Sequence, residues 1–266
     1  MNQYEKRMLA ILEEGKANYG IAAVKAEFEA EGTRSDELLR LLEIARRAGV
    51  KVGIKIGGCE AIRDLIEARQ YGVDYVIAPM VETPYALKKY IDAKNKVFPK
   101  DEQGDISFLF NLETRATFEH LDVLGEVAEA GQVGFVFGRV DYAGSMGHTR
   151  DFVNSAEMQD YIQKVSAVAK ARNLELVVGG GVSPDSIELL STIRKTRLDR
   201  FETRKVIFDA AVLEGDKARQ GMELAIEFEL LWLKNKRDYY QAIAAEDESR
   251  IAMMEARQKG KVAEAA

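Results

Sequence analysis

The sequence has few of the features that mark secreted or membrane proteins. Cys59 is the only cysteine among 266 residues, so no disulfide can form within the chain, which is typical of a reducing compartment. No run of about 18 apolar residues occurs, which argues against a membrane-spanning helix. The N-terminal segment mixes acidic and basic residues and lacks the apolar centre of a secretory leader. We therefore expect a cytoplasmic protein with no membrane partner.

Excess positive charge and proline are also scarce. The net charge is −6 and no compact basic patch occurs, so nucleic acid is not an expected partner. Only four prolines are present, and no proline-rich linker divides the chain. Hydrophobic residues at 47% and charged residues at 31% are usual for a globular protein. We expect one domain over residues 1–245 and a polar, frayed or disordered tail over residues 246–266.

What the sequence does contain is a regular alternation of short apolar runs with amphipathic segments. The runs predict seven strands, at 21–29, 51–56, 74–80, 108–112, 133–137, 174–178 and 201–208. Strands that alternate with helices are typical of a parallel sheet covered by helices. Glycines and acids at the strand ends favour a TIM-type (β/α) barrel over a doubly wound open sheet. Since such a barrel needs eight strands, we expect it to be incomplete or irregular at the first strand.

A long helix is predicted near the C-terminus, over about residues 216–240. It carries an apolar stripe that includes Leu224, Phe228, Leu231 and Trp232. Such a stripe must be covered, either by the chain's own barrel or by a second subunit. We favour a homo-oligomer that assembles through this helix.

Two acidic residues follow consecutive central strands. Glu113 comes just after the run FLFNL, and Asp141 follows VGFVFGRV. Carboxylates at the C-terminal ends of adjacent barrel strands can hold a divalent metal, and oxygen ligands suit a hard cation such as Mg²⁺. Either acid could instead cap a helix, so both interpretations stay open at this point.

The segments DYVIAPMVET, FLFNLETRATFEHLD and GFVFGRVDYAGSMGH resemble the HpcH/HpaI aldolase/citrate lyase family over about residues 26–182. The resemblance implies a TIM barrel and a metal-dependent carbon–carbon lyase. It implies that Glu113 and Asp141 are the protein ligands of Mg²⁺ or Mn²⁺. It also implies that the backbone amides from Gly138 to Asp141, including Arg139 and Val140, receive the carboxylate of a 2-oxo acid. Oligomers whose C-terminal helices cross to a neighbouring barrel are a further implication.

Two positions depart from the family pattern. Where members carry Asp-x-Glu-His or Asp-x-Glu-Asp, this chain has Glu27-Phe28-Glu29-Ala30, so the histidine of the base is missing. Where members place an arginine, this chain has Lys55, which supplies the charge but not the planar two-pronged geometry.

These residues suggest a division of roles in enolate chemistry. Lys55 could stabilise the negative oxygen, and Glu29 or Glu27 could act as the base. Glu82, at the end of the third strand, and Arg139 are candidates for substrate contact. The alternative role for Lys55 is a structural ion pair with Glu27 or Glu29.

The predicted function is a Mg²⁺- or Mn²⁺-dependent aldolase or lyase. It would form or cleave a carbon–carbon bond next to a small-molecule 2-oxo acid, pyruvate- or oxaloacetate-like, through a metal-stabilised enolate. One alternative is an acyl-CoA lyase of malyl or citramalyl type, although no adenine-binding basic cluster is evident. Another is a non-catalytic metal- or ligand-binding barrel, which the loss of the family's histidine and arginine would favour. The sequence names neither the aldehyde or thioester partner nor the direction of the reaction.

Overall fold

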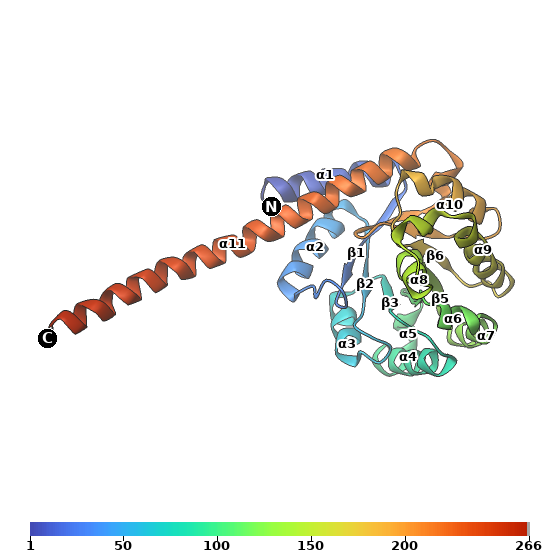
Figure 1. The fold of residues 1–266 in the computed structure, drawn as a ribbon, viewed down its shortest axis with the longest axis horizontal. Helices are drawn as coiled ribbons and strands as arrows, with labels where there is room; N and C mark the ends of the chain where they lie inside the picture. Colours follow the sequence, from blue (N-terminus) through green and yellow to red (C-terminus); the bar gives the residue numbers. More distant parts are fainter. Residues whose placement is uncertain (265–266) are drawn as a thin grey trace.

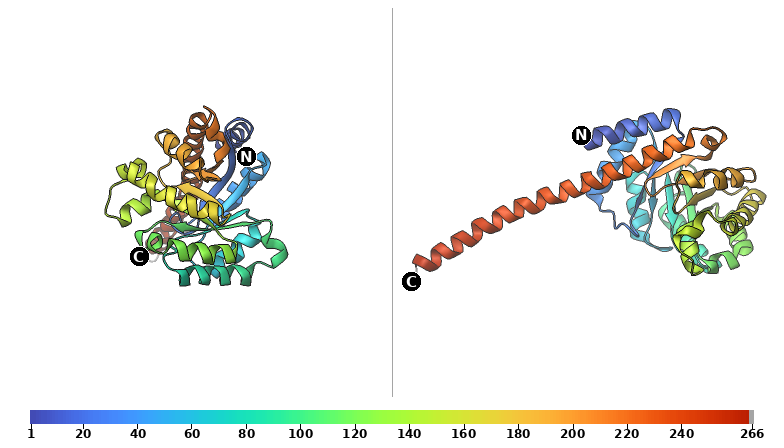
Figure 2. Two further views of the ribbon diagram at one scale, coloured as in Figure 1. Left: turned by 90° about the vertical axis from the view of Figure 1, so that its right-hand side faces the viewer. Right: turned by 45° about the horizontal axis from the view of Figure 1, so that its top comes forward.

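The computed structural model describes residues 1–264, and its centre is a closed barrel of eight strands (Figures 1 and 2). Neighbouring strands in the sequence are also neighbours in the barrel, and β8 closes it by pairing with β1. The strands are β1 (Ile21–Glu27), β2 (Lys51–Lys55), β3 (Tyr75–Ala78), β4 (Ser107–Leu112), β5 (Gly134–Gly138), β6 (Leu176–Gly179), β7 (Arg200–Glu202) and β8 (Val206–Asp209). The TIM-type barrel expected from the sequence is confirmed.

Helices surround the barrel. They are α1 (Gln3–Asn18), α2 (Ser35–Ala48), α3 (Ile62–Tyr71), α4 (Pro84–Val97), α5 (Lys100–Gln103), α6 (Arg115–Glu119), α7 (Leu121–Gly131), α8 (Arg139–Ser145), α9 (Ala156–Ala171), α10 (Ile187–Arg194) and α11 (Ala218–Glu264), with 3-10 turns η1 (Arg150–Asn154), η2 (Pro184–Ser186) and η3 (Ala210–Glu214). Local sequence sets several ends: Thr83 caps α4 just before Pro84, and Gly49 and Gly72 end α2 and α3 in the left-handed conformation.

The eighth strand is hidden in the segment predicted as the seventh. Residues 201–208 do not form one strand but a hairpin, because the chain reverses at Thr203–Lys205. The Thr203 hydroxyl accepts the N–H of Val206, and the N–H of Thr203 donates to the Val206 carbonyl. β8 is therefore antiparallel to both β7 and β1, whereas β1 to β7 run parallel. The prediction of an all-parallel barrel was wrong at this one strand.

The first strand is complete, so of the two alternatives expected there the barrel is irregular rather than incomplete. β1 ends at Glu27, so Glu29 lies in the loop that follows rather than in the strand. Its pairing with β8 does shift register between Ile21 and Ala23. The barrel is thus closed on every side, and its irregularity lies where β8 meets β1.

Two apolar layers hold the fold together. The larger lies between the strands and the helices and includes Leu112, Phe137, Val178 and Phe201. The smaller fills the barrel itself and contains the side chains of Ile77, Leu109, Val136 and Val177 together with Ala23, Tyr75 and Ile207. Because strand side chains alternate between these layers, the residue after each outer one faces into the barrel.

The C-terminal helix runs along the barrel and then leaves it. Near its start, Gly221 lies against Tyr19, and further along, the Trp232 ring lies under the ammonium of Lys205 in the β7–β8 hairpin. Its predicted apolar stripe packs on its own barrel, where Phe228 and Trp232 are buried. Beyond about residue 240, α11 projects from the barrel as a single helix (Figures 1 and 2).

The expected frayed or disordered tail is wrong for residues 246–264, which continue α11 as helix. Residues 265–266 of that prediction lie outside the described residues. A helix of this length is stable where side-chain pairs or a partner support it, and its composition is rich in helix formers. Within residues 1–264, no helix is both long enough and apolar enough to cross a membrane.

Candidate active site

Glu113 is fixed at the C-terminal end of β4. The residue is only 1% exposed, Oε1 accepts the N–H of Met80 at 2.8 Å, and Oε2 accepts the amide of Asn111 at 2.6 Å. Met80 donates from a left-handed backbone conformation with φ of 49°, which is unfavourable for a residue with a side chain. Strain of this kind is common where a functional carboxylate must be held in one position.

The charges near Glu113 act in opposite directions. Burial raises the pKa of Glu113, the charge of Lys55 and the two hydrogen bonds lower it, and the charge of Asp141 raises it again, with a net increase. The two predicted metal ligands are thus close enough to repel each other, although Asp141 lies exposed on α8. Repulsion between two carboxylates is relieved when a cation binds between them.

Lys55 links two carboxylates at the mouth of the barrel. Its Nζ lies 3.1 Å from Oε2 of Glu29 and 3.8 Å from Oε2 of Glu113, and its side chain is 11% exposed. The structure therefore brings three of the predicted site residues together. The lysine does not pair with Glu27, although the two are register partners on β1 and β2.

A second lysine, Lys25, lies inside the barrel between two other carboxylates. Its Nζ is 2.5 Å from Oε1 of Glu202 and 3.3 Å from Oε1 of Glu27. Burial disfavours the ammonium form, but the charges of Glu202 and Glu27 outweigh burial and raise the pKa of Lys25 above its ordinary value. Lys25 therefore stays protonated and is a poor candidate for a Schiff-base nucleophile.

Glu113, Gly138, Gly179 and Glu202 form one row across four adjacent strands. Gly138 and Gly179 are register partners, and the residues that precede the row, such as Leu112 and Phe137, are paired in the same order. A Cβ on Gly138 would lie 2.9 Å from Oε2 of Glu113, and one on Gly179 would lie 3.0 Å from Cγ of Glu202. The two glutamates thus lean over the two glycines from opposite sides.

The backbone amides at the start of α8 lie beside another glycine. Gly180 has φ of 78°, and a Cβ on it would lie 2.7 Å from the nitrogens of both Arg139 and Val140. Because a Cβ is bonded directly to Cα, this distance means that the Gly180 backbone itself packs against these amides and that only glycine fits there. The contact of a substrate carboxylate with the amides from Gly138 to Asp141 therefore stays a prediction.

The side chain of Arg139 is turned away from this place. It is fully buried, and its guanidinium donates to the carbonyls of Gly179 and Val153 and to the side chains of Asn154 and Ser186. Burial lowers the pKa of Arg139 to about 10. This side chain fixes the loops around β5 and β6, so it is not available for the substrate contact considered for it.

Glu82 is the least integrated of the predicted residues. It lies exposed in the loop between β3 and α4, two residues beyond Met80. Its position at the mouth agrees with the sequence argument, but no hydrogen bond or ion pair orients it among the described residues.

The residues around Glu113 fit a divalent cation in chemistry. Among the charged residues linked to Glu113 or Lys25 by ion pairs or by charge, acids outnumber bases; the acids are Glu27, Glu29, Glu31, Glu113, Asp141 and Glu202, and the bases are Lys25, Lys55, Arg204 and Lys205. The carboxylate ligand atoms are oxygens, as Mg²⁺ and Mn²⁺ prefer. Within residues 1–264, no cluster of three or more metal-binding side chains occurs, so Glu113 and Asp141 would hold the cation alone, with water or substrate at its other positions.

Sequence reasoning missed Lys25, Glu202 and Asn111. Lys25 and Asn111 interrupt otherwise apolar strands, a signal that would have marked them as inward-facing polar residues. Glu202 was noticeable only as part of Glu-Thr-Arg, which repeats the sequence at Glu113. Its contact with Lys25 depends on β8 lying between their strands, which the sequence did not show.

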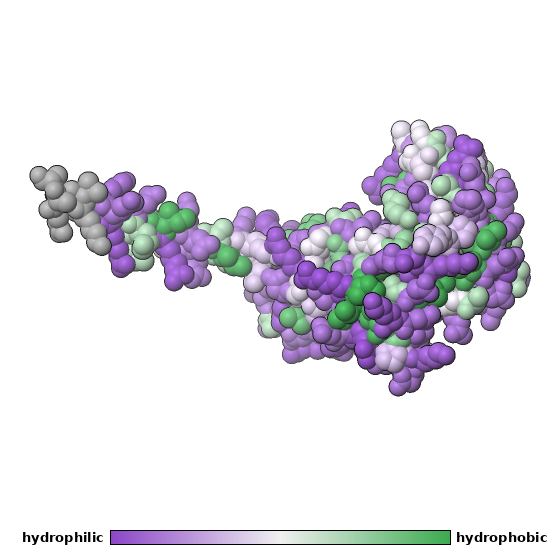
Figure 3. All heavy atoms as spheres, turned by 90° about the horizontal axis from the view of Figure 1, so that it is seen from below, coloured by the Kyte–Doolittle hydropathy of each residue, from purple (hydrophilic) through white to green (hydrophobic). Residues whose placement is uncertain are grey.

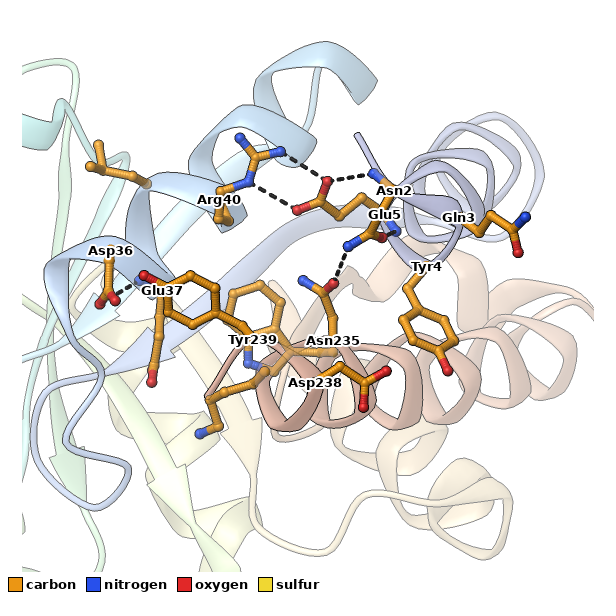
Figure 4. Close-up of a pocket in the computed structure, with 13 residues that line it drawn as sticks. Asn2, Gln3, Tyr4, Glu5, Asp36, Glu37, Arg40, Asn235, Asp238 and Tyr239 are labelled. Atoms are coloured by element: carbon orange, nitrogen blue, oxygen red, sulfur yellow. Dashed lines mark hydrogen bonds and ion pairs between the residues drawn. The ribbon is translucent and has the colours of Figure 1, made fainter. Parts of the chain in front are cut away.

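A separate pocket of about 870 Å³ lies on the outside of the barrel between α1, α2 and α11 (Figure 4). The side-chain amide of Asn2 donates a hydrogen bond to Asn235 across it. On its wall, Nε and Nη2 of Arg40 donate to the two carboxylate oxygens of Glu5. None of the predicted site residues lines this pocket. It therefore belongs to the packing of α11 and not to the mouth of the barrel.

Solved structures of similar fold agree with this description. An HpcH/HpaI aldolase from Desulfitobacterium hafniense matches with a TM-score of 0.60 and 15% identity, over 80% of this chain and 85% of the other. An HpcH/HpaI aldolase/citrate lyase family protein from Burkholderia cenocepacia matches with a TM-score of 0.58 and 13% identity, over 91% and 99%. A variant of the citrate synthase SbnG matches with a TM-score of 0.56 and 14% identity, over 86% and 90%. At these identities the likeness shows the fold.

No curated protein sequence matches the chain significantly. The model of one family, described as HpcH/HpaI aldolase/citrate lyase, matches residues 33–185, which is more than half of the chain. The matched segment contains Lys55, Glu113, Gly138 and Asp141, which the fold gathers at one end of the barrel. The chain belongs to the HpcH/HpaI aldolase/citrate lyase family, whose members are generally lyases and typically depend on a divalent metal.

Proposed function

We propose that this protein is an aldolase or lyase that uses Mg²⁺ or Mn²⁺ and forms or cleaves a carbon–carbon bond next to a pyruvate- or oxaloacetate-like 2-oxo acid. The observation that supports it most is Glu113, a buried carboxylate held by two hydrogen bonds, with Asp141 and Lys55 beside it. Glu113 and Asp141 would hold the cation, which supplies Lewis-acid stabilisation of negative charge on substrate oxygens. The proposal includes a cytoplasmic location, which the single cysteine supports.

The chain's own residues bind and orient the substrate. The backbone N–H groups from Gly138 to Asp141, at the start of α8, would donate to the substrate carboxylate. Gly138 provides close approach to Glu113, since any side chain there would collide with its carboxylate. Glu82, exposed at the rim, would contact the outer part of the substrate.

Lys55 would stabilise the oxygen that becomes negative when the bond next to the keto group breaks. Its ammonium is largely buried, so its charge acts through a medium of low dielectric constant. Glu29, 3.1 Å from that ammonium and partly exposed, would take the proton of a substrate hydroxyl. Glu27 is held by Lys25 deeper in the barrel and is the second candidate for this base.

Two other functions remain possible for the same barrel. An acyl-CoA lyase would need a basic surface at the rim for the nucleotide, and Arg115 and Arg150 are exposed basic residues near α8 that could contribute to one. A non-catalytic ligand-binding barrel would keep Glu113 and Asp141 but would not need a base. The lysine that bridges Glu29 and Glu113 favours the catalytic function, because a binding site alone does not require it.

The experiment is a measurement of C3 proton exchange. Metal-loaded protein is mixed with pyruvate in D₂O, and loss of the methyl signal is followed by NMR, with metal-free protein as the control. Oxaloacetate is tested in parallel for decarboxylation and exchange. Metal-dependent exchange supports enolate chemistry, and its absence with both acids at saturating metal would rule it out.

A further inference from the structure

Glu202 on β7 faces the mouth of the barrel opposite Glu113. We propose that Glu202 is the catalytic residue that exchanges protons with the substrate's C3 carbon. This inference rests on the proposed function and extends it, since neither the sequence pattern nor the family model marks Glu202. The family match ends at residue 185, before β7 begins.

The environment of Glu202 points to a ligand. Its side chain is only 6% exposed, and Oε1 is bonded to Lys25 at 2.5 Å. Oε2 is buried and has no hydrogen-bond partner among residues 1–264, as is also true of Oδ1 of Asn111. A buried acceptor without a donor is unfavourable, so both oxygens are suited to a group that enters the barrel mouth.

The position of Glu202 also follows from the row of four strand-end residues. Glu113 leans over Gly138 and Glu202 leans over Gly179, and these glycines are adjacent register partners. The two glutamate side chains therefore lie next to each other along the row, so a small acid held beside Glu113 lies near Glu202. A Cβ at Gly179 would lie 3.2 Å from Oε1 of Glu202, so only glycine leaves Glu202 in this position.

The chemical step is a proton transfer that balances without any further reactant. The carboxylate of Glu202 takes one proton from C3 of pyruvate, the C–H electron pair becomes the C2–C3 double bond, and the carbonyl pair moves onto oxygen. In the reverse step the Glu202 carboxyl returns the proton to C3 and is again ionised. Lys25 keeps its charge throughout and holds Glu202 in place. Glu29 serves the separate proton of the hydroxyl at the aldol carbon.

The test separates binding from turnover. Oxalate, a dianion with the shape of the enolate, is titrated calorimetrically into metal-loaded wild type, Glu202→Gln and Glu5→Gln, and pyruvate exchange is measured on each. Glu5 is the matched control, because it is also a buried carboxylate in an ion pair but lies outside the barrel. Removing the charge of Glu202 beside a bound dianion should tighten oxalate about tenfold, whereas exchange should fall about 100-fold or more.

Each result decides between the two proposals. If wild type exchanges and Glu202→Gln exchanges equally well, the role of Glu202 is overturned and the proposed function stands. If the wild type does not exchange C3 protons but Glu202→Gln binds oxalate more tightly, Glu202 lies beside the bound acid and the enolate function is wrong. If oxalate affinity and exchange match the Glu5→Gln control, Glu202 is only a structural partner of Lys25.

A second variant covers the case in which Glu202→Gln does not fold. Gly179→Ala would place a methyl group 3.0 Å from Cγ of Glu202 and displace its side chain, whereas Gly104→Ala adds one where no atom lies within 4 Å. The first should lower pyruvate exchange and the second should leave it unchanged. Equal exchange in both would overturn the role of Glu202.

A different observation concerns α11. Its outward face carries a heptad seam, defined here as Ile226, Leu230, Leu233, Arg237, Tyr240, Ala244, Asp247, Ile251 and Met254, at alternating spacings of four and three. Five of its apolar members are 49–58% exposed, including Leu233 and Ile251 on either side of the point where the helix leaves the barrel. Figure 3 shows apolar surface among polar side chains on the projecting part.

The seam is complementary to itself when a second α11 runs in the opposite direction. We propose that two copies of the chain pair through antiparallel α11 helices about a two-fold axis near residue 242. That register places Leu230 against Met254 and Leu233 against Ile251, and it pairs Arg237 of one copy with Asp247 of the other. A parallel pair would instead place each of these charges against its own kind.

Contacts within one chain do not compete strongly with this pairing. Arg237 contacts only its neighbour Asp238, an exposed pair of small value. Tyr240 is half-buried, and its hydroxyl donates to Glu37 on α2, so it can lie at the seam while it anchors the helix. The partner's last turns would cover Ile226 and Leu230, which are exposed on the barrel side of the seam.

A charge exchange tests the orientation. By light scattering, the wild-type assembly should have at least twice the 29.7 kDa chain mass. Arg237→Asp and Asp247→Arg should each halve the assembly mass, and the two together should restore it. The matched control is Lys236→Asp, one residue outside the seam, which should leave the mass unchanged. A monomeric wild type, or single reversals that keep the parent mass, would overturn the proposal.

Discussion

The ammonium nitrogen of Lys55 lies 3.8 Å from Oε2 of Glu113, and the same nitrogen lies 3.1 Å from Oε2 of Glu29. One cation therefore serves both the carboxylate proposed to hold the metal and the carboxylate proposed to act as the base. A purely structural lysine would need only one of these partners. This sharing makes Lys55 the residue whose replacement should separate turnover from metal binding.

Lys55→Met should lower C3 exchange or bond cleavage by about 100-fold, because the negative oxygen loses its nearest protein cation. Metal affinity should stay within a few-fold of wild type, since Lys55 is not a ligand. Lys55→Arg serves as the control that keeps the charge and should retain part of the activity. Full activity in Lys55→Met would assign the lysine to structure alone.

The metal site is tested by titration rather than by activity. Wild type should bind about one Mn²⁺ per chain, measured by the loss of the free-ion signal in electron paramagnetic resonance. Glu113→Gln or Asp141→Asn should abolish this binding, whereas Glu82→Gln, also at the mouth but exposed and without oriented contacts, should not. Stoichiometric binding that persists in the Glu113 and Asp141 double variant would contradict the assignment.

The close packing of Gly180 on α8 has a control with the same backbone conformation. Gly180 has φ of 78° and Gly147 has φ of 80°, so alanine strains the two backbones similarly. Only at Gly180 would the added Cβ also lie 2.7 Å from the Arg139 and Val140 nitrogens, because no atom lies within 4 Å at Gly147. Gly180→Ala should therefore lower the Tm about 2–4 °C more than Gly147→Ala in a thermal melt. Equal losses of Tm would mean that backbone strain alone is responsible.

Glu31 should make the stability depend on acid pH. Burial would raise the pKa of Glu31, but Lys205 and Arg204 outweigh it and lower the pKa below its ordinary value. The stabilisation is therefore complete above the unfolded pKa of about 4.3 and is lost as the pH falls through the lower folded value. Glu31→Gln should lower the Tm by about 2–4 °C at pH 7. That difference should shrink as the pH approaches 3, and a constant difference would contradict the ion-pair explanation.

Much of the barrel and half of the site could be predicted from sequence. Apolar periodicity located β1 to β6, and acids after two strands located Glu113 and Asp141, because a parallel barrel gathers all such ends at one mouth. The hairpin escaped because Thr203–Lys205 contains no glycine, asparagine or proline to mark a turn. The apolar pattern on both sides is continuous, so nothing local shows the reversal.

The missed residues share a physical cause. Lys25 and Glu202 are 177 positions apart and meet only because the barrel closes through β8. The direction of the Arg139 side chain likewise depends on Asn154 and Ser186, which belong to two later turns. Sequence periodicity predicts which face a residue occupies, but not which distant side chain it meets there.

The reversed last strand decides where the chain leaves the molecule. Because β8 is antiparallel, it ends at the end of the barrel opposite the mouth, and α11 starts there. The helix passes Tyr19 and then reaches the β7–β8 hairpin at the mouth before it projects from the barrel. The 24 residues from 241 to 264 extend about 36 Å past the mouth at 1.5 Å per residue. A parallel eighth strand would have directed the same helix away from the mouth. Reversal of one four-residue strand thus makes the approach to the barrel mouth a surface that another polypeptide can share.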